Sequence, residues 1–443
     1  MLGEYRIVGR RASEIAASVE QGVGSGALPP GRLLPPMREL AAALEVNPNT
    51  VAAAYRTLRE RGVIETAGRR GSRVRSRPAS TIRDSLGFEV PPGARQVADG
   101  NPDPALLPPL YDAFAAAARE QDRSPMLYGA SPVDPDLARL ARAALDADGV
   151  PDGSIAVTSG SLDAIERVLA AHLRPGDAVA VEDPGWGRVF DLLAALGMRP
   201  VPVPVDDDGP RPDGVRDALA KGSKALIVTC RAQNPTGSVI TAARAGELRD
   251  VIAAHPDLLL VEDDHGYAIV PDPLHPLAGT VRHWVLIRSA AKVYGPDLRL
   301  AFMTGDPLTL DRVGGRQQLG PGWVSRLVQR AVVELWSSGA VDPPAVERAY
   351  GERRDALIAA LARRGIAACG RSGMNVWVPV ADETGTVARM LHAGWVVAPG
   401  ARFRLAAPPG IRLTVSMLTA EDIEPLAEAV ATATAAAPRR SYG

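Results

Sequence analysis

The segment SAAKVYGPDLRLA, residues 289–301, decides which fold this sequence adopts. An apolar run, residues 284–287, leads into it, and Lys292 stands between small and apolar neighbours. Lysine prefers the solvated surface, so its place directly after a core strand requires an explanation. One explanation is a side chain that lies along the strand end and holds its ammonium in water. The other is a lysine whose amine is kept reactive by partial burial and forms a Schiff base.

The composition is that of a globular chain, with a net charge of −1 and 46% hydrophobic residues. Two cysteines, Cys230 and Cys369, cannot form a disulfide framework, which favours a reducing compartment. The sequence has neither a signal peptide nor a run of the roughly 18 apolar residues that a membrane span needs. The histidines and cysteines lack metal-ligand spacing, so we expect no metal site and no membrane contact, and we predict a cytoplasmic location.

The charge is unevenly distributed along the chain. Residues 1–80 carry 13 arginines, no lysine and seven glutamates, a net charge of +6, so the remainder carries −7. A basic module joined to an acidic body indicates a polyanionic partner for the first part. Arginine suits bidentate contacts with phosphate or guanine, although a coding bias toward Ala, Arg and Pro produces the same arginines.

The first 76 residues follow the pattern of a winged helix-turn-helix. Apolar residues at helical spacing predict a helix over 11–23, and Pro36 opens a second, short helix. Asn47 is a suitable N-cap for a third helix that Gly62 ends. A short hairpin, residues 63–75, follows. The alternative is a small helical dimerisation or cap domain whose arginines are solvated.

The winged pattern predicts where double-stranded DNA would bind. The second helix of a helix-turn-helix pair enters the major groove with its first turn at the bases, while arginines before it and on the wing reach phosphates or the minor groove. The predicted DNA-binding residues are Arg38, Asn47, Asn49, Thr50, Arg69, Arg70 and Arg73.

Apolar, strand-like runs alternate with helical stretches from residue 105 to 436. The runs are residues 155–157, 178–181, 201–203, 225–228, 258–261 and 285–287. Continuous apolar strands separated by helices predict an α/β fold with a buried, mostly parallel sheet. Ligands on such sheets collect beyond the carboxyl ends of the strands, so the residues that follow each strand are the candidates for a site.

Each strand end carries residues with an ordinary explanation and a chemical one. Residues 159–161 open a helix and form either an N-cap or an anion site. Trp186 is either a core residue or an aromatic plate. Asn234, within Asn-Pro-Thr-Gly, can point into the cleft, and the carboxylate of Asp263 needs a cationic partner.

Together these strand ends match the needs of one ligand, pyridoxal 5′-phosphate (PLP). The aldehyde of PLP needs an amine, and its ring nitrogen needs a carboxylate. Its 3′-oxygen needs an amide, and its ring needs an aromatic side chain to stack on. Its phosphate needs small residues together with an arginine. The residues predicted to meet these needs, in that order, are Lys292, Asp263, Asn234, Trp186, and the phosphate group Ser159, Gly160, Ser161, Ser289 and Arg299.

Both parts of the chain resemble known families. Residues 34–41, 46–51 and 55–58 resemble the GntR-family DNA-binding domain. The Asn-Pro-Thr-Gly turn, the strand-end aspartate and the Ser-x-x-Lys motif followed by an arginine resemble the fold-type I aminotransferases. This resemblance implies a PLP-dependent aminotransferase fold with a smaller C-terminal α+β domain.

The aminotransferase resemblance implies three further site residues. Tyr128 resembles the tyrosine that crosses a dimer interface to the cofactor phosphate. Arg412 resembles the arginine that clamps a substrate α-carboxylate, its alternative being a surface strand arginine. His265 stands where relatives often have a tyrosine that faces the 3′-oxygen, which places it among the cofactor-binding residues.

The combination of the two parts resembles the MocR-type subfamily of GntR transcriptional regulators. That resemblance implies a head-to-tail homodimer that binds a DNA operator and senses a small amine, an amino acid or PLP itself. The implied domains are a DNA-binding domain at 1–76, a linker at 77–98, a large PLP-binding domain at 99–344, a small domain at 345–436 and a tail at 437–443.

Three functions remain open at the level of sequence. The first is a ligand-sensing transcriptional regulator, in which turnover is not the main role. The second is a working aminotransferase that carries a DNA-binding appendage. The third is a DNA-binding scaffold that needs no cofactor, against which the presence of Lys292, Asp263 and Asn234 argues.

Overall fold

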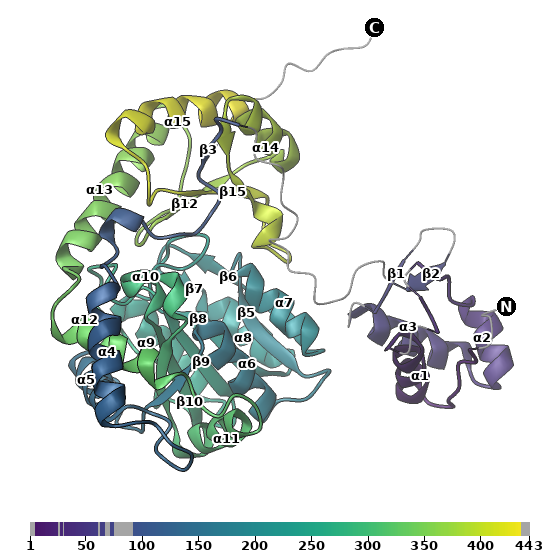
Figure 1. Cartoon of the computed structure of the whole chain (residues 1–443). Coiled ribbons are helices and arrows are strands. Elements are labelled where there is room, and N and C mark those ends of the chain that lie inside the picture. Colours follow the sequence, from purple (N-terminus) through teal and green to yellow (C-terminus); the bar gives the residue numbers. More distant parts are fainter. Residues whose placement is uncertain are drawn as a thin grey trace, which may run out of the picture. The chain divides into compact units, whose positions relative to one another are not determined.

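A computed structural model describes residues 5–24, 27–29, 31–60, 63–66, 71–74 and 92–435. The chain forms two compact units, one built mainly on the N-terminal residues and one built mainly on residues 92–435 (Figure 1). The predicted tail at 437–443 and most of the predicted linker lie outside the described residues.

The described residues of the N-terminal unit form three helices and a two-stranded antiparallel sheet. Its elements are α1 (Ala12–Gly24), α2 (Met37–Leu44), α3 (Pro48–Glu60), β1 (Ile64–Thr66) and β2 (Ser72–Val74). Ile15 and Val19 of α1 and Val51 and Leu58 of α3 are buried in one apolar core, as the helical spacing predicted. Leu33 adds an isolated bridge to Arg73 of β2. This is a winged helix-turn-helix.

The second unit is organised around an eight-stranded sheet. Its strands are β4 (Ala156–Thr158), β5 (Ala178–Asp183), β6 (Arg199–Asp206), β7 (Gly209–Pro210), β8 (Ser223–Thr229), β9 (Leu259–Asp264), β10 (His283–Ser289) and β11 (Ala301–Gly305). The order across the sheet is β4-β11-β10-β9-β8-β5-β6-β7. Strands β5, β8, β9 and β10 run parallel, which confirms the predicted α/β class. Strand β11 is antiparallel to both neighbours and was not predicted.

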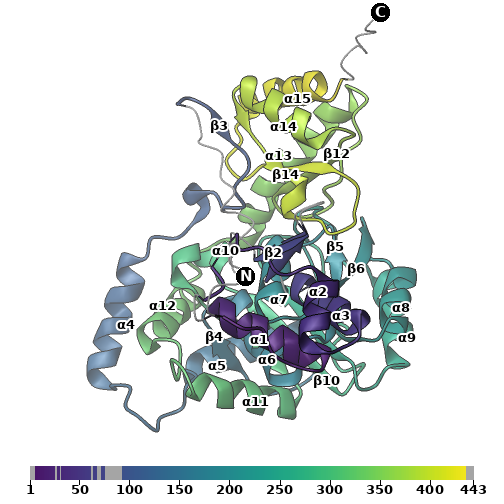
Figure 2. The same cartoon turned by 90° about the vertical axis from the view of Figure 1, so that its right-hand side faces the viewer.

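Helices connect and flank these strands (Figures 1 and 2). They are η3 (Pro104–Leu106), α4 (Tyr111–Arg123), α5 (Pro135–Ala147), α6 (Ser161–His172), α7 (Gly187–Ala195), α8 (Pro212–Ala220), α9 (Ala242–Ala253), α10 (Ala291–Tyr294), η4 (Pro296–Leu298), α11 (Pro307–Gln318) and α12 (Arg326–Ser337). Capping residues and prolines determine where several of these helices begin. Asp134, for example, accepts hydrogen bonds from the backbone N–H groups of Asp136 and Leu137, and proline occupies the first position of α5.

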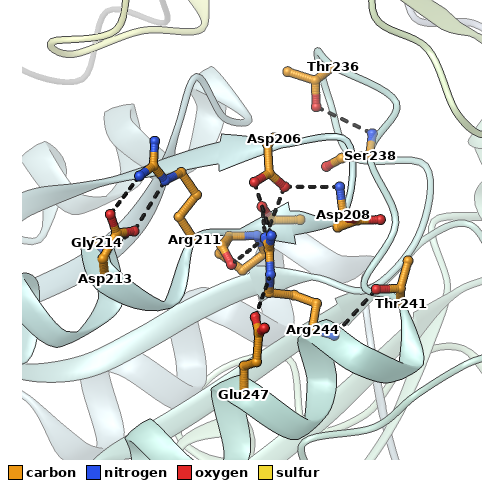
Figure 3. A network of polar contacts seen from close by, with 12 residues as sticks. Asp206, Asp208, Arg211, Asp213, Gly214, Thr236, Ser238, Thr241, Arg244 and Glu247 are labelled. Atoms are coloured by element: carbon orange, nitrogen blue, oxygen red, sulfur yellow. Dashed lines mark hydrogen bonds and ion pairs between the residues drawn. The ribbon is translucent and has the colours of Figure 1, made fainter.

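A surface network joins the β6–β7 turn to helix α9 (Figure 3). The guanidinium of Arg244 donates to both carboxylate oxygens of Asp206, at 2.9 and 3.0 Å, and to the carbonyl of Gly209. Glu247, one turn further along α9, accepts from the same side chain at 3.2 Å. Because Arg244 links β6, β7 and α9 through these hydrogen bonds, we regard this network as a structural tie that holds the sheet edge.

The C-terminal part forms a smaller α+β subdomain. Its elements are α13 (Pro343–Ala362), β12 (Asn375–Pro379), α14 (Glu383–His392), β13 (Trp395–Val396), β14 (Ala398–Pro399), η5 (Gly400–Arg402), β15 (Gly410–Thr414) and α15 (Ala420–Thr434). Strands β12, β15 and β14 form a sheet, around which α13, α14 and α15 gather (Figures 1 and 2).

The first described residues of this unit lie against its C-terminal subdomain. Strand β3 (Arg95–Gln96) lies within the stretch predicted as linker, and it pairs in parallel with β13. The carbonyl of Val97 then accepts from the backbone N–H of Thr414 at 2.8 Å. Residues 95–100, which we call the entry segment, are therefore held by the C-terminal subdomain. In the part of the chain that the structure describes, no helix is both long and apolar enough to cross a membrane.

Candidate functional site

Lys292 lies one residue into α10, directly beyond the carboxyl end of β10. Its ammonium donates to the carbonyl of Gly100 in the entry segment. Burial, and to a lesser degree the positive charge of Arg412, lowers the pKa of Lys292 to about 8. A neutral amine is the nucleophilic form, so this lysine is partly activated near neutral pH.

Asp263 is the penultimate residue of the neighbouring strand β9 and is 3% exposed. Its Oδ2 atom lies 3.1 Å from Nδ1 of His265. Its Oδ1 atom is buried and has no hydrogen-bond partner among the described residues. A buried carboxylate oxygen without a donor is costly, so this atom marks a position where a donor from a ligand is expected.

His265 is fixed at both ring nitrogens. Besides the contact with Asp263, its Nε2 atom lies 2.9 Å from the carbonyl of Ala232. Burial acts to lower the pKa of His265, but the charge and hydrogen bond of Asp263 outweigh this effect and raise it. The ring therefore bonds protein groups at both ends, whereas the sequence predicted a contact with the cofactor.

Asn234 and Arg412 meet in the same region. The Nη1 atom of Arg412, on β15, donates to Oδ1 of Asn234 at 2.9 Å, and its Nη2 donates to the carbonyl of Ala98. The guanidinium lies over the ring of Phe403, 4.6 Å from its centroid. Arg412 is 5% exposed, so it is not a surface strand arginine. Among the described residues, the structure gives an acceptor role to Oδ1 of Asn234 and no hydrogen-bond partner to its amide nitrogen.

A glycine turn and an arginine face each other beside α6. Gly160 has a φ of +96°, a conformation that favours glycine, and a Cβ at this position would lie 2.6 Å from Nη2 of Arg299, so a side chain here would displace the guanidinium. Arg299 donates to the carbonyl of Ser159 at 3.3 Å. The hydroxyl of Ser161 is buried and has no partner among the described residues. That of Ser289 accepts from Ala291 N–H at 3.2 Å. The group suits an anion.

Trp186 and Tyr128 stand apart from these contacts. Trp186 is half-buried in a loop that follows β5, and Asp183 fixes that loop by accepting from the N–H groups of residues 405–407. Tyr128 is 94% exposed and touches Trp323 edge to face, with centroids 5.7 Å apart. The structure describes no contact between Tyr128 and the other site residues of its own chain.

The predicted DNA-binding residues are partly described. Asn47 caps α3 by accepting from the N–H of Asn49 at 2.8 Å. Arg38 and Asn49 are exposed and Thr50 is half-buried. Arg73 is 41% exposed at its side chain and pairs with Glu65. The two predicted wing-tip contacts, Arg69 and Arg70, lie outside the described residues.

A buried ion network behind the site escaped the sequence analysis. Asp264 accepts from Arg231 at 2.8 Å and from Arg288 at 2.8 Å, and Arg288 also pairs with Asp148. Burial acts to raise the pKa of Asp264, but the two arginines lower it overall. Arg288 is wholly buried in the middle of the sheet. The signal was an arginine inside an otherwise apolar strand, which requires a buried counter-charge.

Comparison with known proteins agrees with this geometry. Residues 99–430 match the family described as aminotransferase class I and II, and residues 11–74 match bacterial regulatory proteins of the gntR family. The fold and the site thus define a winged-helix protein joined to a PLP-binding aminotransferase domain. The chain belongs to the aminotransferase class I and II family, and residues 11–74 add a gntR-family domain, a combination that is consistent with a MocR-type regulator.

Two relatives and one solved structure illustrate these similarities. The vitamin B6 salvage pathway transcriptional repressor PtsJ of Salmonella typhimurium is 39% identical, over 95% of this chain and 98% of its own length. The 2-aminoadipate transaminase of Thermus thermophilus is 28% identical, over 76% of this chain and 88% of its own length. The crystal structure of LysN from Thermus thermophilus, complexed with N-(5′-phosphopyridoxyl)-L-leucine, is similar in fold, with a TM-score of 0.67. The two sequences are 24% identical, and the match covers 78% of this chain and 94% of LysN.

The residues present fit PLP, the cofactor of this family. Oδ1 of Asp263, which has no hydrogen-bond partner among the described residues, suits a protonated ring nitrogen. The hydroxyl of Ser161, in the same condition, suits a phosphate together with Arg299. Lys292 offers an amine of lowered pKa to an aldehyde. When bound, the cofactor supplies that aldehyde and an electron-withdrawing ring. Asp263 would hold the ring charge of the bound cofactor, and Arg412 would offer a cation to a ligand carboxylate.

Proposed function

We propose that the protein is a transcriptional regulator that binds double-stranded DNA through its N-terminal unit and is controlled by the occupancy of its PLP site. The observation that carries this proposal is a winged helix-turn-helix in the same chain as Lys292, Asp263, Ser161 and Arg299, whose geometry fits PLP. We also propose a cytoplasmic location, which a DNA target supports. The 39% identical relative is described as a transcriptional repressor, which supports regulation by DNA binding.

The effector that we propose is PLP itself or a small molecule with an amino group and a carboxylate. The name of the relative concerns vitamin B6 salvage, which favours PLP as the first effector to test. A ligand carboxylate would pair with Arg412, whose Nη2 now binds the carbonyl of Ala98. Exchange of that partner would alter how the entry segment is held. Only a ligand with different affinity for the two arrangements can shift them.

We further propose a head-to-tail homodimer. Tyr128 is 94% exposed, Leu127 67% and Leu319 90%. Large apolar side chains in such positions are typical of surfaces that a partner covers. In the dimer, Tyr128 would reach the phosphate of the cofactor in the other subunit. The mass in solution, measured by light scattering, tests this arrangement.

A working aminotransferase is the second candidate function. The lowered pKa of Lys292 and the buried Arg412 favour it, since both are what amino-group transfer requires. A turnover assay with amino donors and keto acids separates the two functions. Sustained conversion of many substrate equivalents per subunit would support the enzyme, whereas binding without turnover supports the sensor.

DNA binding under control of PLP is the decisive property. We would measure the affinity of the full-length protein for the DNA beside its own gene, with and without PLP, and repeat it with Lys292→Ala. A specific, salt-dependent affinity that PLP changes supports regulation. Binding that is equal for all sequences and indifferent to PLP would remove the proposal.

A further inference from the structure

His265 has no ring nitrogen left for a cofactor. Its Nε2 faces the carbonyl of Ala232 at 2.9 Å, and a carbonyl only accepts, so Nε2 carries a proton. Its Nδ1 faces a carboxylate oxygen of Asp263 at 3.1 Å. The doubly protonated imidazolium satisfies both acceptors at once. The side chain is only 18% exposed, so both contacts are sheltered from water.

The contact with His265 gives the two carboxylate oxygens of Asp263 different roles. Oδ2 is committed to the imidazole, while Oδ1 is buried with no partner within residues 92–435. A carboxylate held at one oxygen has a fixed orientation, so the direction of the second oxygen is also set. That second oxygen is the acceptor that a protonated ring nitrogen needs.

The other contact of His265 reaches a rigid loop. Ala232 has a φ of +55°, which is uncommon for a residue with a side chain. Its N–H donates to the hydroxyl of Ser372 at 2.9 Å, and a Cβ on Gly373 would lie 2.6 Å from the Cβ of Ala232. The carbonyl is therefore held in place two residues before Asn234. His265 thus connects the end of β9 to the loop that carries the site amide.

We propose that His265 is a positioning residue for the cofactor ring, which it serves through Asp263 without touching the cofactor. It orients Oδ1 of Asp263 toward the ring nitrogen and joins Asp263 to the Asn234 loop. Its own positive charge partly offsets the negative charge of the carboxylate. This inference rests on the proposed PLP-controlled function. It replaces a direct contact with the 3′-oxygen as the role of this position.

Electrostatics supports the same assignment. The charged groups that face His265 are Asp263 from β9 and Lys292 from α10. Burial acts to lower the pKa of His265, but Asp263 raises it overall, which favours the imidazolium, while Lys292 opposes it. The repulsion is mutual, so a charged His265 also disfavours a proton on the nitrogen of Lys292. A neutral residue at 265 should therefore move protonation of that nitrogen to higher pH.

Three substitutions separate the two contacts. His265→Asn places an amide N–H near the position of Nδ1 and keeps the bond to Asp263. His265→Gln places its N–H near the position of Nε2 and keeps only the bond to Ala232. His265→Phe keeps the ring volume and removes both bonds. All three are uncharged, so they also report on the lost positive charge.

The measurements are the PLP dissociation constant by equilibrium dialysis and the pH midpoint of the visible absorption change of the full-length holoprotein. We expect weaker PLP binding by about 10- to 100-fold in His265→Phe and His265→Gln, and by less than about threefold in His265→Asn. The pH midpoint should rise in all three. The melting temperature of the cofactor-free protein is the control for folding.

Two results would overturn the inference. One is a His265→Phe protein with the affinity and pH midpoint of the parent, which would leave the histidine a merely packing role. The other is equal PLP affinity of the His265→Asn and His265→Gln variants. This second result would overturn the inference even if the His265→Phe protein fails to fold. A parent protein that does not bind PLP would instead remove the proposed function, so the two failures are distinguishable.

Discussion

The lowered pKa of Lys292 predicts how fast the protein takes up PLP at different pH values. Only the neutral amine attacks an aldehyde. With a pKa of about 8, roughly a quarter of the lysine is neutral at pH 7.5, against about 0.1% for an ordinary lysine. The uptake rate should therefore rise about 14-fold between pH 6.8 and 8.8 and then level off, whereas an unperturbed lysine would give about 100-fold with no plateau.

Stopped-flow absorption after mixing cofactor-free protein with PLP measures this rate, and free Nα-acetyl-lysine at the same pH values is the control for the ionisation of PLP itself. Arg412→Gln removes a positive charge that lowers the pKa of Lys292, so its curve should move to higher pH. Arg412→Lys keeps the charge and should move little. A rate that climbs tenfold per pH unit through pH 10 would refute the assignment of a buried, activated lysine.

Three further predictions concern stability, DNA and assembly. Asp264→Asn leaves Arg231 and Arg288 buried without their shared carboxylate, and we expect a loss of about 3–5 kcal/mol in urea unfolding; a loss below about 1 kcal/mol would contradict it. Arg38→Ala should weaken binding to all DNA sequences and lower the salt slope by about one, whereas an Asn49→Ala protein should lose only its preference for the operator. Competition binding at several salt concentrations checks both. Tyr128→Phe should weaken PLP binding about tenfold without changing the mass by light scattering, if its hydroxyl reaches the other subunit's cofactor; an unchanged dissociation constant would exclude that contact.

The sequence predicted the neighbourhood of the site because parallel strands end at one edge. Asp263 lies near the carboxyl end of β9 and Lys292 follows β10, and these two strands are adjacent and parallel in the sheet. Apolar runs of strand length, each followed by polar residues, were sufficient to place both at that edge. The helices of the N-terminal unit were predictable for a similar reason, since caps and apolar spacing are local signals.

The contacts made by these residues were not predictable, because they depend on distant backbone. Lys292 donates to the carbonyl of Gly100, which is 192 positions away in the sequence. The orientation of His265 depends on the positive φ of Ala232, a residue with no sequence signal for that conformation. Strand β11 follows the lysine segment after a short turn, and its five residues lack a flanking pattern that separates strand from loop.

The central claim is that occupancy of the Lys292 site changes the affinity of the N-terminal unit for DNA. Fluorescence anisotropy of a labelled operator fragment, titrated with full-length protein with and without saturating PLP, measures this coupling directly. We predict a change in the dissociation constant of about fivefold or more in the parent protein and none in Lys292→Ala. An equal dissociation constant with and without PLP, or the same response in both proteins, would contradict the account.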